Sequence, residues 1–298
     1  MLSFKKIGLE DRTRFEKYTL CHGYHNLEAS FANIFIWQRA LDIQMATDEL
    51  AMYLHLSIDN ISYMLPPLLE NCDTSIEEPM RRCEEYLQSR GDNFLMKGVT
   101  VPLKETIERD CPGRYVMTED RANFEYVYNS VDLCTLEGKK YHAKRNHINK
   151  LLSSHSYTYR LYTPDDYQSC ISLYESWMMG KGGMTESYQS ELWAVEAALQ
   201  NLDALGLKCG MLFVDGNLEA FSIGERFGSD MAVIHVEKAN PDLQGAYALI
   251  NREFARNEWS EVKYINREED MGIEGLRKAK LSYNPAFMVE KYICTRNE

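Results

Sequence analysis

Two pairs of β-rich runs, each interrupted by a short polar turn, dominate the pattern of apolar and polar positions. The first pair covers residues 50–65 and turns at Asp59-Asn60, and the second covers residues 210–224 and turns at Asp215-Gly216. Asn, Asp and Gly tolerate the positive φ angles that a tight hairpin turn requires, and Asp-Gly is the stronger signal. The pattern therefore predicts a β-hairpin in each half of the chain.

A comparable series of helices and strands follows each hairpin. The predicted elements are helix 76–91, a strand near Phe94, helix 104–109 and strand 124–129 in the first half, and strand 231–238, helix 241–259 and strand 262–265 in the second. Because each series occupies about half of the chain, the repeat suggests a tandem α+β duplication. The join is expected in the polar stretch 153–163, which gives a first domain at 1–155 and a second at 156–298.

Two further helices are predicted between the join and the second hairpin, at residues 165–178 and 186–205. Thr185 is a candidate N-cap for the second of them, and Gly206 is a candidate for the residue just past its end. The glycine-rich link at 179–184 is either a plain loop or a hinge near a substrate mouth.

Composition places the chain among soluble globular proteins. Of its 298 residues 45% are hydrophobic and 11% aromatic, which allows a sizeable core and excludes global disorder. No apolar run approaches the roughly 18 residues of a membrane span, and the N-terminal residues lack an apolar signal core. We therefore expect a cytoplasmic protein. The eight cysteines form no Cys-x-x-Cys pair, so neither a metal site nor a disulfide framework is predicted.

The charge is strongly acidic overall but uneven. A net charge of −12 argues against binding to duplex DNA. Residues 138–164 nevertheless contain no Asp or Glu, and they carry six cationic side chains: Lys139, Lys140, Lys144, Arg145, Lys150 and Arg160. A local positive patch in an acidic chain suggests an anionic ligand held at one place.

Residues 137–152 of this basic window are predicted to form a helix. At helical spacing Tyr141, Arg145, Ile148 and Leu152 share one stripe, with Lys144 beside it. A guanidinium on a buried stripe needs a partner. For Arg145 that partner is either a carboxylate of the protein itself or a phosphate of a ligand.

Helix 241–259 is predicted to begin at Asn240-Pro241, with Asn240 as its N-cap. Small residues in its opening turns would let a diphosphate approach the backbone amides, where the helix dipole also favours negative charge. Helices also begin this way without ligands. The candidate coenzyme A contacts, which include two from the preceding strand, are Val236, Lys238, Gln244, Gly245, Ala246, Tyr247 and Ala248.

Two segments carry a family resemblance. Residues 136–150 (LEGKKYHAKRNHINK) and 266–280 (NREEDMGIEGLRKAK) resemble an uncharacterised bacterial family related to the C-terminal domain of phosphatidylglycerol lysyltransferases. More distantly the chain is similar to Fem peptidyltransferases and to GNAT acyltransferases. The resemblance covers nearly the whole chain. It implies an α+β fold of two tandem GNAT-like (acyl-CoA N-acyltransferase) domains, each a mixed, mostly antiparallel sheet flanked by helices.

The resemblance also implies site residues near the strand ends. Tyr283 matches the position of the GNAT general acid, and a nearby carboxylate would serve as the base. The candidate bases are Glu237, Glu268, Glu269 and Asp270; Asn266, Arg277 and Lys280 would contact the donor, and Lys144, Arg145 and Arg267 the substrate. Alternatively, Tyr283 is a core tyrosine and these charges neutralise one another.

Three functions remain open at this point. The first is transfer of an acyl group from acyl-coenzyme A to a small-molecule or peptide amine. The second is aminoacyl transfer from an aminoacyl-tRNA, whose single-stranded acceptor end would suit the local positive patch. The third is binding of a nucleotide or peptide without catalysis. No metal is implied by any of them.

Overall fold

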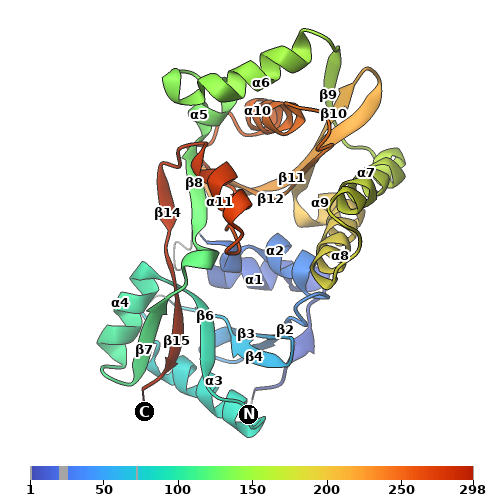
Figure 1. Cartoon of the computed structure of the whole chain (residues 1–298). Helices are drawn as coiled ribbons and strands as arrows, with labels where there is room; N and C mark the ends of the chain where they lie inside the picture. Colours follow the sequence, from blue (N-terminus) through green and yellow to red (C-terminus); the bar gives the residue numbers. More distant parts are fainter. Residues whose placement is uncertain (1, 20–25, 72, 298) are drawn as a thin grey trace. The chain divides into compact units, whose positions relative to one another are not determined.

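The computed structural model describes residues 2–19, 26–71 and 73–297, and the chain divides into two compact units (Figure 1). Unit 1 comprises Met1–Phe124 and Val289–Glu298, and unit 2 comprises Glu125–Met288. The predicted boundary at 155/156 does not coincide with this division. The physical reason is non-local strand pairing, because residues 125–129 pair within the sheet of unit 2, whereas residues 291–296 return to the sheet of unit 1.

Unit 1 contains a mixed sheet with the strand order β1-β2-β3-β4-β6-β15-β7, in which β5 also pairs with β3. Its strands are β1 (Lys5–Lys6), β2 (Gln44–Thr47), β3 (Ala51–Ile58), β4 (Ile61–Met64), β5 (Leu68–Leu69), β6 (Leu95–Thr100), β7 (Tyr115–Glu119) and β15 (Lys291–Arg296). Its α-helices are α1 (Arg12–Thr19), α2 (Phe31–Trp37), α3 (Glu77–Ser89) and α4 (Val101–Asp110). Residues of α3, α4 and the central strands share one apolar core.

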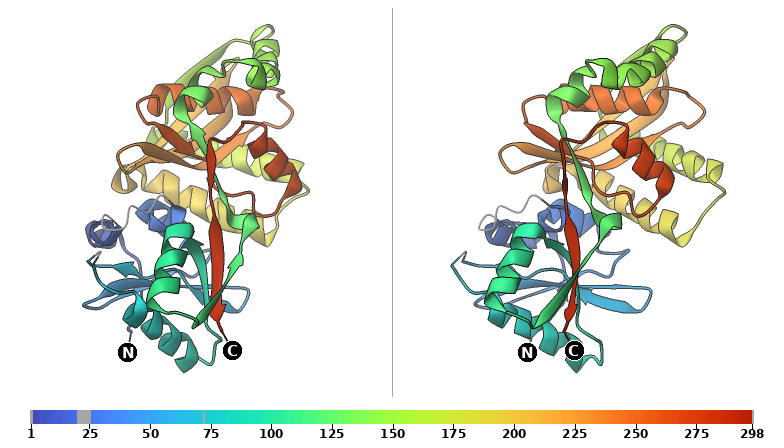
Figure 2. Two further views of the ribbon diagram at one scale, coloured as in Figure 1. Left: turned by 90° about the vertical axis from the view of Figure 1, so that its left-hand side faces the viewer. Right: turned by 60° about the vertical axis from the view of Figure 1, so that its left-hand side comes forward.

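Unit 2 contains a second mixed sheet with the order β14-β8-β13-β12-β11-β10-β9. Its strands are β8 (Glu125–Asn129), β9 (Tyr157–Leu161), β10 (Leu207–Val214), β11 (Asn217–Phe227), β12 (Met231–Ala239), β13 (Tyr264–Asn266) and β14 (Phe287–Val289). Its α-helices are α5 (Ser130–Thr135), α6 (His142–Leu152), α7 (Tyr167–Gly180), α8 (Glu186–Gln200), α9 (Leu202–Leu205), α10 (Ala246–Glu258) and α11 (Glu274–Leu281). Helix α10 packs on β11 and β12 from one face, with α6 beside it, and α7 covers the other face (Figures 1 and 2).

Both predicted hairpins are confirmed. Strands β3 and β4 are joined at Asp59 and Asn60, whose φ angles are 50° and 62°. Strands β10 and β11 are joined at Asp215 and Gly216, with φ angles of 49° and 86°. Positive φ at both central residues is the geometry that fits the right-handed twist of a hairpin, which explains the residue types at these turns.

The helix predicted from residue 241 begins later, at Ala246. Asn240 does not cap it, because the Asn240 side chain accepts a hydrogen bond from the Asp242 amide (3.0 Å) and forms a local turn. Asn commonly stabilises such turns in competition with a helix. Gly245 then precedes α10 with a φ of 104°. By contrast, the predicted cap of α8 is confirmed, since Thr185 accepts a hydrogen bond from the Tyr188 amide at 3.2 Å.

A bulge in β12 and a left-handed turn after β13 position polar side chains near the strand ends of unit 2. The pairing of β11 with β12 shifts between Ile223 and Gly224, which leaves His235 in a bulge. Strands β12 and β13 run parallel and pair over Met231–Val233 and Tyr264–Asn266. After β13 the chain turns through Glu268, which has a φ of 59°. Left-handed backbone at a non-glycine residue is costly and persists only where its surroundings enforce it.

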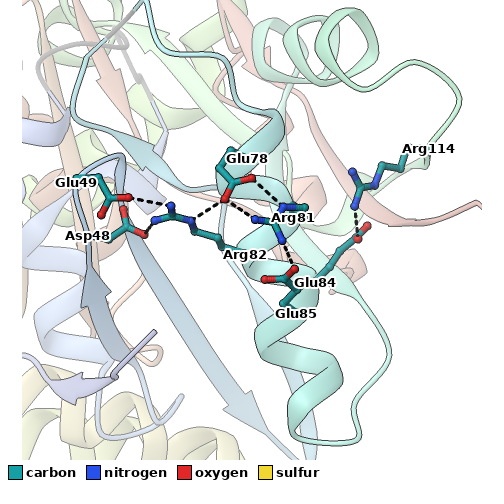
Figure 3. Close-up of polar contacts among 8 residues, drawn as sticks. All are labelled: Asp48, Glu49, Glu78, Arg81, Arg82, Glu84, Glu85 and Arg114. Carbon is teal, nitrogen blue, oxygen red and sulfur yellow. Dashed lines mark hydrogen bonds and ion pairs between the residues drawn. The ribbon is translucent and has the colours of Figure 1, made fainter. Parts of the chain in front are cut away.

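Charged side chains of unit 1 gather on the surface of α3 (Figure 3). Arg82 donates to Glu49 (2.8 Å), to Glu78 (3.1 Å) and to Asp48. Arg81 also pairs with Glu78, at 2.6 Å. Surface networks of this kind contribute little to stability per pair.

Cysteines and membrane character add little to this picture. Cys21 and Cys72 lie outside the described residues, and the other six cysteines are free thiols. Across residues 2–19, 26–71 and 73–297, no helix has the length and apolar character that crossing a bilayer requires.

Candidate functional site

A charged pair lies on the α10 face of the second sheet, at the ends of β12 and β13. Arg267 Nη2 donates to Glu237 Oε1 at 2.8 Å, and Asn251 Nδ2 of α10 donates to Glu237 Oε2 at 3.0 Å. Only 12% of the Arg267 side chain and 11% of the Glu237 side chain are exposed. A pair this deeply buried requires good geometry to offset the loss of hydration.

Aromatic rings and a second cation complete the arrangement, which we call the Glu237 cluster (Lys144, Glu237, Asn251, Arg267, Tyr128 and Tyr283). The Arg267 guanidinium carbon lies 4.7 Å from the ring centroid of Tyr283 and 5.7 Å from that of Tyr128. Lys144 Nζ, from α6, lies 3.9 Å from the centroid of the Tyr283 ring. Rings attract cations at such distances. The cluster therefore brings together three predicted site residues from distant parts of unit 2 with Tyr283.

Two polar atoms of this cluster lack a partner. Arg267 Nη1 and Asn251 Oδ1 are buried, and neither has a hydrogen bond within the described residues. Buried polar atoms without partners are rare in folded proteins, and each calls for an explanation. Here one donor and one acceptor remain unused on either side of the Glu237 carboxylate, which is the arrangement a polar ligand would complete.

The surroundings of the cluster shift two pKa values in ways that matter for chemistry. Burial, reinforced by the charge of Arg267 and opposed by that of Glu237, lowers the pKa of Lys144 to about 8. Burial raises the pKa of Tyr283 above its usual range, although Arg267 acts in the opposite direction. Tyr283 thus remains a protonated phenol at neutral pH, as a proton donor must be.

The polar residues after β13 are bonded to one another. Asp270 accepts two hydrogen bonds from Arg277, both 2.9 Å, and one from the Tyr126 hydroxyl at 2.6 Å. Lys280 donates to the carbonyls of Arg267 and Glu269. Burial opposes ionisation of Asp270, but the bonds from Arg277 and Tyr126 prevail and hold its pKa well below the usual range. Lys280 thus holds the backbone at Arg267, whereas Asp270, paired with Arg277, holds the turn that follows through the Gly272 amide.

Asn266 has a similar internal position. It donates to Glu125, and its side-chain oxygen accepts from the Glu268 amide at 2.9 Å. The bond to that amide holds the left-handed turn at Glu268 in place. The contacts of Asn266, Arg277 and Lys280 with a donor remain predictions.

The opposite face of the sheet holds a buried histidine between two carboxylates. His235 Nε2 lies 3.1 Å from Glu225 and Nδ1 lies 2.9 Å from Glu268. Burial works against the charged ring, but the two carboxylates prevail and raise the pKa of His235 to about 10. Glu268, a predicted base, is therefore the partner of a cation on the face away from the Glu237 cluster.

Lys238 and Val236 also lie away from the Glu237 cluster. Lys238 Nζ lies 2.8 Å from Glu191 of α8 and 3.6 Å from the centroid of the Trp177 ring of α7. The Val236 carbonyl accepts a hydrogen bond from Ser222 at 3.1 Å. Both predicted cofactor contacts are engaged with the protein itself.

Helix α6 crosses the start of α10, where the diphosphate contacts are predicted. Gln244 accepts from Lys150 at 2.9 Å, and its amide nitrogen lies 3.1 Å from His147 Nδ1. A methyl group added at Gly245 would come within 2.6 Å of the His147 carbonyl oxygen. Ala246 and Ala248 are buried, and Tyr247 is 37% exposed. The small residues here thus fit a close helix contact.

Within the described residues Arg145 pairs with backbone carbonyls and not with a carboxylate. Its guanidinium donates to the carbonyl of Gly138 (2.7 Å) and to that of Leu136. Leu136 is left-handed, with a φ of 51°, so its carbonyl is turned out of the preceding helix. A carboxylate partner is therefore not found among the described residues, because two backbone carbonyls accept from the guanidinium instead. Contact of Arg145 with a ligand phosphate stays a prediction.

Sequence reasoning missed Asn251, Tyr128 and the Glu225–His235 contact. Asn251 carried a usable signal, because it is a polar residue four positions after Tyr247 in the apolar stripe of its helix, and it is 3% exposed. Tyr128 and Glu225 carried none, since they reach the site through strand pairing. Among the described residues, no group of three or more His, Cys, Asp or Glu side chains is arranged to hold a metal.

The chain matches the model of a known protein family. The model of the family described as "Phosphatidylglycerol lysyltransferase, C-terminal" matches residues 23–295. The chain belongs to this family. The predicted relationship is thereby confirmed, and the family is one of transferases by its description.

Solved structures agree at the level of the fold. A conserved protein of unknown function from Bacteroides thetaiotaomicron is 37% identical over 100% of both chains, with a TM-score of 0.91. L-PGS from Bacillus licheniformis is 15% identical, covering 98% of this chain and 94% of that chain, with a TM-score of 0.63. A tandem GNAT protein from the clavulanic acid biosynthesis pathway is 9% identical over 99% and 98%, with a TM-score of 0.57. The tandem GNAT-like α+β fold is confirmed.

One curated relative is also similar. An uncharacterized protein, MYCGA3080, from Mycoplasmoides gallisepticum is 24% identical over 180 residues, which are 60% of this chain. The match spans 57% of that protein's length.

Proposed function

We propose that this protein transfers an aminoacyl group from an aminoacyl-tRNA to an acceptor amine, and that the Glu237 cluster holds the aminoacyl group. The observation that carries the proposal is the unused donor and acceptor beside Glu237, on Arg267 and Asn251. An α-amino ester has the complementary groups, an ammonium and a carbonyl oxygen. The family description, which names a lysyltransferase, supports the same class of donor.

In this proposal each group of the cluster has a role. The ammonium of the aminoacyl moiety would be bound by Asn251 Oδ1 and the Glu237 carboxylate. Arg267 Nη1 would donate to the ester carbonyl, where negative charge develops during attack, and such donors contribute strongly to catalysis in buried sites. Tyr283, kept protonated by its burial, would donate a proton to the departing ribose oxygen.

Acyl-coenzyme A is the second candidate donor. Its diphosphate would use the amides at the start of α10, which the dipole of that helix favours. The close approach of the His147 carbonyl to Gly245 weighs against this donor, because α6 would have to move away. For this reason we rank aminoacyl-tRNA first.

The test compares the two donors directly. The purified protein is incubated with hydroxylamine as a small acceptor and with either a pool of aminoacyl-tRNAs or acetyl-coenzyme A, and hydroxamate formation is measured. We expect aminoacyl hydroxamate above the rate without protein, and loss of that excess in Glu237→Gln. Product from acetyl-coenzyme A alone would replace the proposal with the second donor. Saturable binding of both donors without product would leave a binding protein.

A further inference from the structure

The Glu237 cluster contains two cations and one carboxylate. Arg267 is paired with Glu237, whereas Lys144 Nζ has no hydrogen bond or ion pair within the described part of the chain. It lies over the face of the Tyr283 ring, 3.9 Å from the ring centroid. An amine in this position keeps its nitrogen available to a ligand.

The groups around Lys144 make it readily deprotonated. The charged groups that face it are Arg267, after β13, and Glu237 of β12, and the titratable ring it contacts is Tyr283, after α11. Burial and Arg267 lower its pKa to about 8 against the attraction of Glu237. Near neutral pH a minority of the molecules therefore carry a neutral amine, which is the form able to accept a proton.

The carboxylates predicted as bases are less suited. Both oxygens of Glu237 accept hydrogen bonds, from Arg267 and Asn251. Glu268 is paired with His235 on the other face of the sheet. Asp270 is held in its ionised form by Arg277 and Tyr126.

We propose that Lys144 is the general base of the transfer reaction and takes the proton from the attacking acceptor amine; this rests on the proposed function. The acceptor nitrogen forms a bond to the ester carbon and loses its proton to the Lys144 amine. The ester C–O bond breaks, and the departing oxygen takes the phenolic proton of Tyr283. Proton return from the Lys144 ammonium to the Tyr283 phenolate, directly or through water, restores both residues.

The first test needs no substrate. The intact protein is labelled with trace acetic anhydride between about pH 6 and pH 11, and acetylation of each lysine is measured by mass spectrometry, with the exposed Lys139 as internal reference. We expect half-maximal reactivity of Lys144 near pH 8. In Arg267→Met the midpoint should rise, because a neighbouring positive charge is removed. A Lys144 midpoint at or above 10.5, the usual lysine value, would overturn the inference.

The second test uses hydroxamate formation from aminoacyl-tRNA. General bases typically contribute about a hundredfold or more, so Lys144→Met and Lys144→Arg should each lower kcat/KM by that factor. In the unsubstituted protein the pH profile of kcat/KM should have an inflection near pH 8, where Lys144 loses its proton. This inflection should be absent in both variants, because methionine has no proton to release and arginine keeps its charge. Lys263→Met serves as the control for removal of an exposed lysine.

The outcomes separate the two proposals. If Lys144→Met retains the activity and the inflection of the unsubstituted protein, Lys144 is not the base. If the unsubstituted protein forms no hydroxamate while Lys144 titrates near pH 8, the donor assignment fails, and with it the role of Lys144 as base.

Discussion

Each unit has a buried histidine on a strand of its sheet, and the two surroundings differ in kind. His55, on β3 of unit 1, is 1% exposed, and neither ring nitrogen has a hydrogen bond within the described residues. It packs edge-on against the rings of Phe4 and Tyr86, with centroids 5.8 and 5.3 Å away. His235, on β12 of unit 2, is held between Glu225 and Glu268. Unit 1 buries a neutral ring against aromatic rings, whereas unit 2 buries a cation with its counter-charges.

The same contrast extends to arginine. Arg81 and Arg82 of unit 1 pair with carboxylates on the surface of α3, and their side chains are 43% and 24% exposed (Figure 3). Arg267 of unit 2 is nearly buried with Glu237. Preorganised charge in a water-poor site acts more strongly on a reacting group than charge at the surface. The buried charges of unit 2 are therefore the ones suited to act on a reacting group.

The largest expected effect is on the buried pair. In Arg267→Met the Glu237 carboxylate is left buried without its counter-charge, and we expect unit 2 to lose about 3–5 kcal/mol of stability. Urea unfolding followed by hydrogen exchange of α10 and β12 measures the loss separately from unit 1. Replacing both Arg267 and Glu237 by Met should cost less than Arg267→Met alone. A loss below about 1 kcal/mol for the single variant would show that the pair behaves as an exposed one.

The next largest effect is the dependence of unit 2 stability on pH that His235 causes. Its folded pKa, about 10, lies above the ordinary value of 6.5, so the stabilisation is fully present below pH 6.5 and is lost as pH rises toward 10. Unfolding free energies between these limits should decline for the unsubstituted protein, and the decline should be shallower in His235→Gln. Identical slopes would mean that the ring is not charged in the folded state.

The dependence of stability on pH that His55 causes should have the opposite sign. Burial, with Arg90 acting in the same direction and Asp42 and Asp92 against it, lowers the pKa of His55 below 6.5. The unfolded chain then binds the extra proton, so stability is present above pH 6.5 and is lost as pH falls below it. Because two buried nitrogens lack partners, His55→Leu should stabilise unit 1 by about 1–3 kcal/mol and reduce the acid loss. Thermal unfolding at two pH values checks both; a destabilised variant would contradict the unpartnered state.

The smallest effect is expected at the surface of unit 1. Arg81→Met removes an exposed guanidinium that pairs with Glu78, and the change in unfolding free energy should stay below about 1 kcal/mol. Urea unfolding in the same buffer as for Arg267→Met provides the comparison. A loss as large as that of the Arg267 variant would remove the distinction between the two units.

Local patterns in the sequence predicted the features that depend on neighbouring residues. The turn residues Asp59-Asn60 and Asp215-Gly216 specify their hairpins, and Thr185 specifies the start of α8. The pairing of β15 with β6 and β7 joins residues that are 173 to 200 positions apart, and no local pattern records it.

The same division between local and non-local features applies to the site. Lys144, Glu237, Arg267 and Tyr283 were identified from residue type and family resemblance. Their joint position around one carboxylate, the inclusion of Asn251, and the α6 contact at Gly245 depend on packing between distant elements. The tertiary contacts also separate Glu268 and Asp270 from the cluster, although sequence proximity placed them with it.

The most direct test of the account is a structure of the intact protein with a stable donor mimic, 3′-lysylamino-3′-deoxyadenosine. We expect the α-ammonium of the mimic to contact Asn251 Oδ1 and Glu237, and its carbonyl oxygen to accept from Arg267 Nη1. Binding elsewhere in the chain, with Arg267 Nη1 and Asn251 Oδ1 still unpartnered, would contradict it.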